Sequence, residues 1–512
     1  MYLVFNISLI LHQFVFVQSS SLFSPTSLPH EVNVFQENDL RCPLKCRCTR
    51  KIVRCVGAGY TEFPSDFPVE MVTLDFARNF ISKLTQTILI KLTRLHSIDL
   101  ISNNISVISD TAFINMVDLN TLILANNRLA FPRPGIFSPL RSLRILDLSG
   151  TSAQFNAEDY ANFTNLENLG LNDLQLKTFP TFCRKEVPLL PKLSILRLDK
   201  NSIDSVIAEN LRCLKELSML SLQDNKIDFL LKNTFGGLGK LEKLWLQRNH
   251  PLSKVSYLAF KSTSLKVLSL TNSGYIGKNS NVFTCIQGIE HLFLANIKIQ
   301  RSTLLPVMFK NLRQLTLLDL TGVDFRGSLP TTMLENVTKL KSLFLSNTNI
   351  GTYLDRRFFS SFSNSLEELD MAKNKLAIIN KTSLPVDLWN SLRRIDLSEN
   401  PFICDCNIIW FRRWMIKSNV SIFRSRNDLQ HSNILDYRCN GPADVHGKSI
   451  ITLSNQIEAE CIEGPYDWTF SAIFMFEIII MMSSSLASIL HRYRWHVKYW
   501  LFVYKVKCCI RY

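Results

Sequence analysis

Apolar residues recur along most of the chain at one fixed spacing. In the stretch 119–129, leucine stands at Leu119, Leu122, Leu124 and Leu129, and Asn127 stands two residues before the last leucine, which gives the pattern LxxLxLxxNxL. Copies of this pattern return about every 24 residues. A unit this short cannot bury its own apolar face, so consecutive turns must stack and share one core.

The pattern also predicts the structure of each turn. The run around Leu122 predicts a short strand of a parallel sheet, and Asn127 suits the following turn because its amide can satisfy backbone groups. Phe137 would fill the space behind the sheet, as Phe113 and Phe235 would in other turns. The expected fold is an α/β leucine-rich repeat solenoid, a horseshoe with a concave parallel β-sheet.

Residues 63–400 hold about fourteen such repeats. The Asn position falls at Asn79, Asn103, Asn127, Thr151, Leu174, Asn201, Asn225, Asn249, Ser273, Ile297, Val323, Thr348, Asn374 and Asn400. Eight of these keep Asn, and a Leu, Ile or Val side chain cannot replace the hydrogen bonds of the amide. We therefore expect a regular solenoid at both ends and an irregular middle. A functional cause and simple drift in tolerant repeats both explain the interruption.

Cysteine clusters stand at both ends of the repeats. Four close cysteines within residues 42–62 predict a disulfide-stapled N-terminal cap, with zinc ligation as the alternative: Cys42, Cys46, Cys48 and Cys55. Four more within residues 401–463, around an aromatic helix, predict a C-terminal cap with two bridges, Cys404 to Cys439 and Cys406 to Cys461. Caps are needed because the end turns would otherwise expose the core and an unpaired strand edge.

Other features indicate an exported chain. Residues 1–19 predict a secretory signal peptide, with an N-terminal anchor as the alternative. Thirteen cysteines fit an oxidising compartment, where Cys183 and Cys213 of neighbouring repeats are candidates for a further bridge and Cys285 has no evident partner. Five glycosylation sequons also fit the secretory route: Asn104, Asn162, Asn336, Asn380 and Asn419.

An apolar segment near the C-terminus predicts a membrane span. Residues 468–490 are long enough to cross a bilayer of about 30 Å, and the basic, aromatic residues 491–512 are typical of a cytoplasmic tail. The expected topology is single-pass type I, with the repeats outside. Glu477 interrupts the span, and we weigh a pairing role in assembly against simple tolerance of a protonated side chain.

A net charge of +15 can indicate a protein that binds nucleic acid. Six of the 58 basic residues lie in the last 22 positions, and the others are scattered rather than gathered in a stripe. The distribution therefore does not support a nucleic-acid ligand, although it does not exclude one. No catalytic, cofactor-binding or metal-binding constellation stands out, so the sequence predicts a binding protein and not an enzyme.

In each predicted strand, the residue between the two inward leucines should lie on the concave face of the sheet. This series is acidic at both ends and aromatic in the middle: Asp75, Asp99, Ile123, Asp147, Gly170, Arg197, Ser221, Trp245, Ser269, Phe293, Asp319, Phe344, Asp370 and Asp396. Trp245, Phe293 and Phe344 fall on alternate strands, roughly 10 Å apart, with Val267 and Leu317 beside them. We expect an exposed apolar patch that binds a partner, unless glycans or curvature cover the rings.

Together these features resemble a Toll-like receptor ectodomain with its transmembrane segment and juxtamembrane stem. The resemblance depends on the two caps, on Cys404-Asp405-Cys406, on the span, and above all on the stem residues 491–496 and 498–500. It implies an innate-immunity receptor that binds a microbial or endogenous ligand, including lipid-bearing ones, and forms homo- or heterodimers. It also implies residence in the cell-surface membrane, with endosomes as the other location.

One departure separates the sequence from that family. Its members continue into a cytoplasmic TIR domain, whereas the given sequence ends at Tyr512 without a recognisable TIR start. The two expectations are a TIR-less co-receptor or decoy and a truncated sequence. A leucine-rich repeat adhesion or developmental receptor without a signalling domain is the alternative function.

Overall fold

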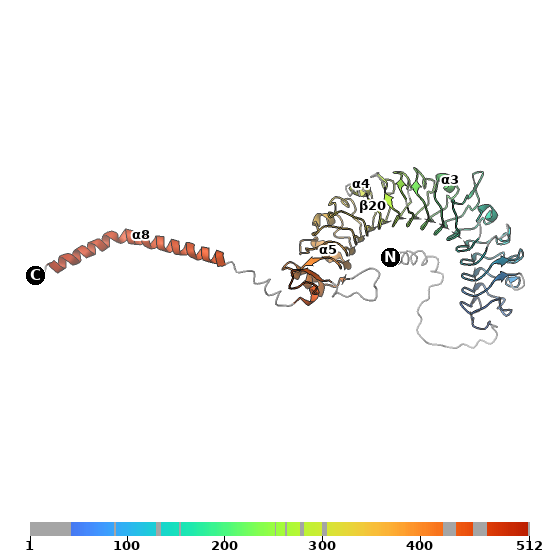
Figure 1. The fold of residues 1–512 in the computed structure, drawn as a ribbon, viewed down its shortest axis with the longest axis horizontal. Helices are drawn as coiled ribbons and strands as arrows, with labels where there is room; N and C mark the ends of the chain where they lie inside the picture. The colour runs from blue at the N-terminus through green and yellow to red at the C-terminus, as the bar shows by residue number, and fades with distance from the viewer. Residues whose placement is uncertain are drawn as a thin grey trace. The chain divides into compact units, whose positions relative to one another are not determined.

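The computed structural model describes residues 42–85, 89–129, 135–152, 155–250, 252–261, 264–276, 281–299, 305–422, 437–453 and 468–509. The chain divides into two compact units, Met1–Thr452 and Leu453–Tyr512. The first holds the repeats, whose turns are stacked side by side (Figure 1). The predicted signal peptide, residues 1–19, lies outside the described residues.

One parallel sheet runs along the first unit. Within the described residues each of the fourteen repeats contributes one three-residue strand: β3 (Thr73–Asp75), β5 (Ser97–Asp99), β7 (Thr121–Ile123), β8 (Ile145–Asp147), β9 (Asn168–Gly170), β12 (Ile195–Arg197), β13 (Met219–Ser221), β15 (Lys243–Trp245), β17 (Val267–Ser269), β19 (His291–Phe293), β21 (Leu317–Asp319), β22 (Ser342–Phe344), β23 (Glu368–Asp370) and β24 (Arg394–Asp396). The caps extend this sheet. At the N-terminal end β2 (Ile52–Arg54) pairs parallel with β3, and β1 (Arg47–Cys48) pairs antiparallel with β2. At the other end β26 (Ser421–Ile422) pairs parallel with β24.

The segments between these strands hold only short elements. Two-residue strands form small additional sheets: β4 (Lys83–Leu84) with β6 (Val107–Ile108), β10 (Cys183–Arg184) with β11 (Val187–Pro188), β14 (Phe229–Leu230) with β16 (Lys254–Val255), and β18 (Tyr275–Ile276) with β20 (Lys298–Ile299). The helical turns are η1 (Ala157–Tyr160), α3 (Ala208–Leu211), α4 (Leu305–Phe309), η3 (Arg356–Phe359) and α5 (Val386–Ser391).

The core lies between the sheet and these segments. The middle residue of each strand points inward, as Leu122 and Leu244 do with no exposed surface. Behind the sheet, the rings of Phe113 and Phe137 stack with centroids 5.7 Å apart, and those of Phe235 and Phe260 stack at 6.1 Å. The role predicted for these phenylalanines is confirmed: neighbouring turns share a column of stacked rings.

The buried asparagines satisfy backbone groups at the turn, as predicted, and they also link successive turns. The Nδ2 of Asn127 donates to the carbonyl of Leu124 in its own turn and to that of Leu100 in the preceding turn, both at 2.9 Å. Its Oδ1 accepts from the backbone N–H of Ile105 at 3.0 Å. One amide therefore satisfies three buried backbone groups, which explains why the position favours Asn.

Where Asn is replaced, smaller side chains supply part of these bonds. Thr151 and Thr348 donate to a carbonyl of their own turn, at 2.8 and 2.7 Å, and Ser273 donates to Leu246 of the preceding turn at 2.7 Å. The sheet itself continues through this region without a register shift from β15 to β24. The expectation of an irregular middle was therefore wrong for the sheet, because inward leucines hold each strand in place whatever follows it.

Disulfides close both ends of the unit. Cys42 pairs with Cys48 and Cys46 with Cys55, which satisfies the N-terminal cluster without a metal. Cys183 and Cys213 are joined, and Cys285 is a free, half-buried thiol.

The C-terminal cap packs α6 (Ile408–Lys417) and η5 (Ile450–Thr452) together, with β25 (Phe402–Ile403) beside β27 (Cys439–Gly441). Cys404 pairs with Cys439, as predicted. Cys406 is also disulfide-bonded, whereas its predicted partner Cys461 lies outside the described residues.

The second unit contains one long helix, α8 (Trp468–Cys509). Within its described residues, no single helix has the length and hydropathy of a membrane span. Two parts of it, Ile473–Ile489 and His491–Lys507, meet that test only as a pair, with a bend of 41° between them. Glu477 lies on this helix with its side chain exposed.

Candidate functional site

The sheet face turned away from the core is the candidate site. Strand pairing aligns the last residues of neighbouring strands, so Ser221, Trp245, Ser269, Phe293 and Asp319 are direct neighbours in one row. Phe344 continues the row on β22. The register confirms the series of face residues that the repeat pattern predicted.

The aromatic residues of this row are less exposed than expected. Trp245 is only 6% exposed and Phe344 only 2%, whereas Phe293 and Leu317 are half-buried. The prediction of an open apolar patch was therefore wrong for Trp245, Phe344 and the 9% exposed Val267. Large side chains on adjacent rows of a sheet cover one another, and a pattern that places them on one face does not show this mutual burial.

Trp245, Met219 and Val267 form a buried cluster, with Ile195 and Phe293 packed against it. We call these five residues the central cluster. The sequence had not singled out Met219 and Ile195. They occupy the first position of their strands, in the same row as Val267, and that row would have revealed them.

Two rings of the central cluster meet across an intervening strand. The centroids of Trp245 and Phe293 are 6.1 Å apart with the ring planes tilted by 37°, although two strand spacings separate their backbones by about 10 Å. The rings therefore lean toward each other over Ser269, which lies between them in the row and has no exposed surface. Such tilted pairs add about 0.5–1.5 kcal/mol beyond their area burial.

Four polar atoms of the same region of the sheet lack hydrogen-bond partners among the described residues. They are Nε1 of Trp245, Oε1 of Gln247, Oγ of Ser269 and Oγ1 of Thr271. All four residues lie on β15, β17 or the residues that follow these strands. A guest group that separated the two rings would find donors and acceptors there as well as apolar surface.

A network of polar side chains lies next to the cluster. The buried carboxylate of Asp199 accepts from the hydroxyl of Ser221 and from the side-chain amide of Gln223, the latter at 2.9 Å. Gln247 donates to Oε1 of Gln223 at 2.6 Å. Burial nevertheless raises the pKa of Asp199 above its usual range, although these bonds oppose the shift. The network fixes side chains at one edge of the cluster.

The acidic ends of the row are strongly desolvated. Burial raises the pKa of Asp99 to about 6, and the carboxylates of Asp75 and Asp147 in the same row add to the shift. Burial also raises the pKa of Asp396 to about 6 at the other end. Arg197 faces Asp147 with 4.0 Å between the guanidinium nitrogen and the carboxylate oxygen. The face thus has an apolar centre, with carboxyls of raised pKa at Asp75 and Asp99 toward one end and at Asp396 toward the other.

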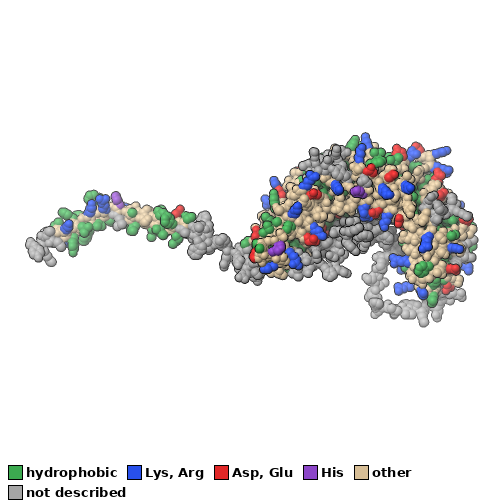
Figure 2. All heavy atoms as spheres, viewed as in Figure 1, with side chains coloured by type: hydrophobic (Ala, Val, Ile, Leu, Met, Phe, Trp, Pro, Cys, Tyr) green, Lys and Arg blue, Asp and Glu red, His purple; other side chains and the backbone are tan. Residues whose placement is uncertain are grey.

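The remaining predicted sites lie away from this face or on its margins. Asn162 and Asn419 are exposed, whereas Asn104, Asn336 and Asn380 are half-buried. On the face of the repeat unit visible in Figure 2, basic and acidic side chains are intermixed and form no single stripe. That agrees with the scattered charge of the sequence.

Comparison with known proteins identifies the repeats. The family model described as Leucine rich repeat matches residues 70–129, 93–152 and 191–250. Toll-like receptor 7 of Mus musculus is 26% identical over 151 residues, 30% of this chain and 13% of that protein. Toll-like receptor 5 of Homo sapiens is 29% identical over 171 residues, 33% of this chain and 18% of its own length. The matched stretches thus span less than a fifth of these relatives.

Solved structures support the fold. The crystal structure of the TLR13–ssRNA13 complex superposes with a TM-score of 0.55 at 22% identity, covering 76% of this chain and 57% of that one. An LRR protein of Leptospira interrogans superposes with a TM-score of 0.54 at 21% identity, covering 72% of this chain and 94% of that one. At such identities the likeness shows a leucine-rich repeat solenoid and leaves the ligand of this chain open.

Proposed function

We propose that the repeat unit is the extracellular recognition domain of a Toll-like single-pass membrane receptor of innate immunity. The observation that carries this proposal is the central cluster, an apolar centre on a broad sheet face with buried polar atoms that have no partner among the described residues. The modest sequence identity to Toll-like receptors supports the receptor class. The disulfides at both ends of the repeats fit an oxidising, extracellular location.

The ligand would bind by moving the rings of Trp245 and Phe293 apart. A lipid-bearing microbial or endogenous molecule suits the site, because an acyl chain could pack against Phe293 and Leu317, which are already half-exposed. Its polar head could reach the polar atoms near Gln247 and Thr271. A second copy of the receptor, or a related receptor, would complete a dimer around the ligand.

The membrane would be crossed by the first part of α8. Its apolar side chains at Ile473, Phe474 and Ile479 are exposed on the helix, and the basic residues follow on the C-terminal side. Under the positive-inside rule that order would put the repeats outside, and the plasma membrane is the expected location. Protease added to intact cells should then remove the repeat unit and leave α8 protected.

The binding proposal is tested with a fluorescent triacylated lipopeptide and the full-length receptor in detergent. Phe293→Ala combined with Leu317→Ala should weaken binding at least tenfold, because both lost side chains would contact the acyl chains. The matched control combines Ile114→Ala and Val117→Ala, two exposed apolar residues outside the strands, and should bind as the wild type does. Equal weakening in both double variants would discard the sheet face as the site.

The adhesion alternative predicts a different result. An adhesion protein of this kind would make non-adherent cells aggregate when it is expressed alone on their surface, and the lipopeptide would not bind. A receptor should bind the probe and leave the cells dispersed. Aggregation without lipopeptide binding would replace the receptor proposal by the adhesion function.

A further inference from the structure

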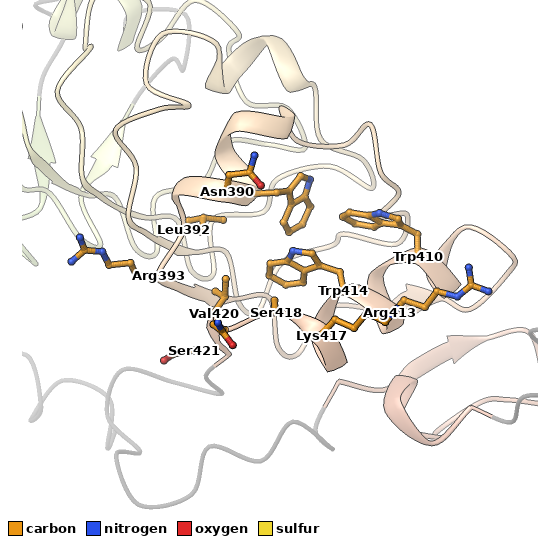
Figure 3. Close-up of a pocket in the computed structure, with 12 residues that line it drawn as sticks. Asn390, Leu392, Arg393, Trp410, Arg413, Trp414, Lys417, Ser418, Val420 and Ser421 are labelled. Atoms are coloured by element: carbon orange, nitrogen blue, oxygen red, sulfur yellow. The ribbon is translucent and has the colours of Figure 1, made fainter.

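A cavity separate from the central cluster lies where the last repeat meets the C-terminal cap. It has a volume of about 800 Å³ and lies between α5, α6 and the residues 418–421 that lead into β26 (Figure 3). That volume is within the range of small-ligand sites, about 300–1,000 Å³. The central cluster lies on β12 to β19, several repeats away.

Three tryptophans dominate the wall of this cavity. The ring of Trp389 lies 4.9 Å from that of Trp410 and 4.6 Å from that of Trp414, centroid to centroid. Trp410 and Trp414 are four residues apart on α6, so they share one side of the helix. Trp389 is buried but the other two are half-exposed, which leaves flat aromatic surface facing the cavity.

The rest of the wall offers hydrogen-bond donors. Arg413 and Lys417 are exposed and line the cavity from the same helix (Figure 3). Nε1 of Trp389 and Oγ of Ser418 are buried and find no hydrogen-bond partner among the described residues. Among the residues that the structure describes, no carboxylate lines the cavity. A suitable ligand therefore has a flat apolar face and many oxygen acceptors, which is the chemistry of a pyranose sugar.

The chain supplies such a ligand at the cavity itself. Asn419 lines the wall, is exposed, and begins the sequon Asn419-Val420-Ser421. We propose that the cavity holds the first sugars of an N-linked glycan attached to Asn419, with their apolar faces on Trp410 and Trp414. This inference rests on the proposed extracellular location, since only a chain in the secretory route receives such a glycan.

The modification itself follows the ordinary transfer chemistry. The side-chain nitrogen of Asn419 forms a bond to C1 of the first N-acetylglucosamine, and the bond from C1 to the polyprenyl pyrophosphate donor breaks. The amide loses one proton, and the polyprenyl pyrophosphate leaves. The attached sugars then cover aromatic surface that water would otherwise contact, so the glycan becomes part of the packing of the cap.

The test uses the full-length protein expressed in animal cells, with glycopeptide mass spectrometry and hydroxyl-radical footprinting of single tryptophans. Ser421→Ala removes the sequon and Ser421→Thr retains it, so the two variants form a matched pair. Ser421→Ala should raise the oxidation of Trp410 and Trp414 severalfold, whereas Ser421→Thr should match the wild type. Asn419→Gln repeats the loss without changing β26, and Asn162→Gln removes another exposed sequon far from these rings.

Each outcome decides the inference. Increased oxidation in Ser421→Ala and Asn419→Gln alone, with buried Trp389 unchanged, supports it. A glycan on Asn419 whose loss leaves Trp410 and Trp414 unchanged overturns it, and so does an unmodified Asn419 in a chain glycosylated elsewhere. A chain with no glycan at any sequon overturns both this inference and the proposed extracellular location.

Discussion

The hydroxyl of Tyr437 accepts a hydrogen bond from the backbone N–H of Leu397 at 2.9 Å. This bond ends the series of backbone hydrogen bonds that joins each repeat to the next. In earlier repeats the equivalent N–H donates to the last strand residue of the next turn, as Leu345 does to Asp370 and Met371 does to Asp396. Leu397 has no following repeat, so a side chain of the C-terminal cap takes the place of a backbone carbonyl. Tyr437 is fully buried, which excludes water from this bond.

Tyr437→Phe should therefore loosen the last repeat without removing packing volume. The N–H of Leu397 would lose its acceptor in a buried place, at a cost of about 1–3 kcal/mol. Hydrogen exchange of residues 394–400 should become faster, while exchange in the central repeats stays the same. Tyr257→Phe, at an exposed tyrosine, is the control, and equal exchange in both variants would show that the hydroxyl does not terminate the ladder.

Asp99→Asn should stabilise the protein at neutral pH. In the unfolded chain this carboxyl titrates near 4, whereas in the folded chain its pKa is about 6. The folded state therefore binds the proton more tightly, so the carboxyl destabilises the fold progressively from pH 4 to 6 and fully above pH 6. The amide removes this penalty, whose upper limit is about 3 kcal/mol, and retains an oxygen for the N–H of Ile101.

The pH dependence provides the check on that prediction. Thermal unfolding should show the gain of Asp99→Asn at pH 7.5 and its disappearance near pH 4. Asp355→Asn should give no gain at either pH, because hydrogen bonds from Arg357 lower the pKa of Asp355. A gain for Asp99→Asn that is the same at both pH values would mean that desolvation of the charge is not its cause.

Gly322→Ala should disturb the turn that follows β21. Gly322 has a φ of +73°, and a Cβ there would collide with the side-chain amide of Asn296. That amide donates to Oδ1 of Asn272 at 2.9 Å, so the alanine must break a bond between turns as well as strain its own backbone. The expected loss of stability is about 1–2 kcal/mol. Gly237→Ala meets nothing within 4 Å and should change the thermal midpoint little, and a similar loss in both would refute this explanation.

Cys404→Ser should prevent delivery of the protein to the cell surface. The bridge from Cys404 to Cys439 ties two segments 35 residues apart in the cap that covers the end of the core. Its loss should lower the free energy of unfolding by about 2–5 kcal/mol. The misfolded cap would then cause the secretory quality-control machinery to retain the protein. Cys285→Ser, at the free thiol, should reach the surface normally in the same labelling assay. Normal delivery of both would show that the cap folds without this bridge.

Much of the sheet could be predicted because one period repeats along the chain. Leu122 and its counterparts must face inward, so the register of β7 and of every later repeat strand follows from the sequence alone. The left-handed backbone conformation before each Asn position was not predicted. Within the described residues, the residue preceding each of the fourteen Asn positions has a φ between +54° and +73°, including Arg78, Lys200 and Glu399. Eight of these fourteen residues are Gly, Asn or Asp, which adopt this conformation readily. Arg78, Lys200 and Glu399 carry no such signal, and there the stacked turns impose the conformation.

By itself, the sequence determined the repeat number, the strand register, the ring column behind the sheet and the pairing of Cys404 with Cys439. These features depend on the spacing of residues along the chain, which the sequence gives directly. Only the tertiary structure decided that Trp245 and Phe344 are buried, that Trp245 leans toward Phe293, and that Trp389 joins Trp410 and Trp414 around a cavity. These features depend on how large side chains from different turns fill the same space, and a periodic pattern fixes the face of each side chain but not its neighbours.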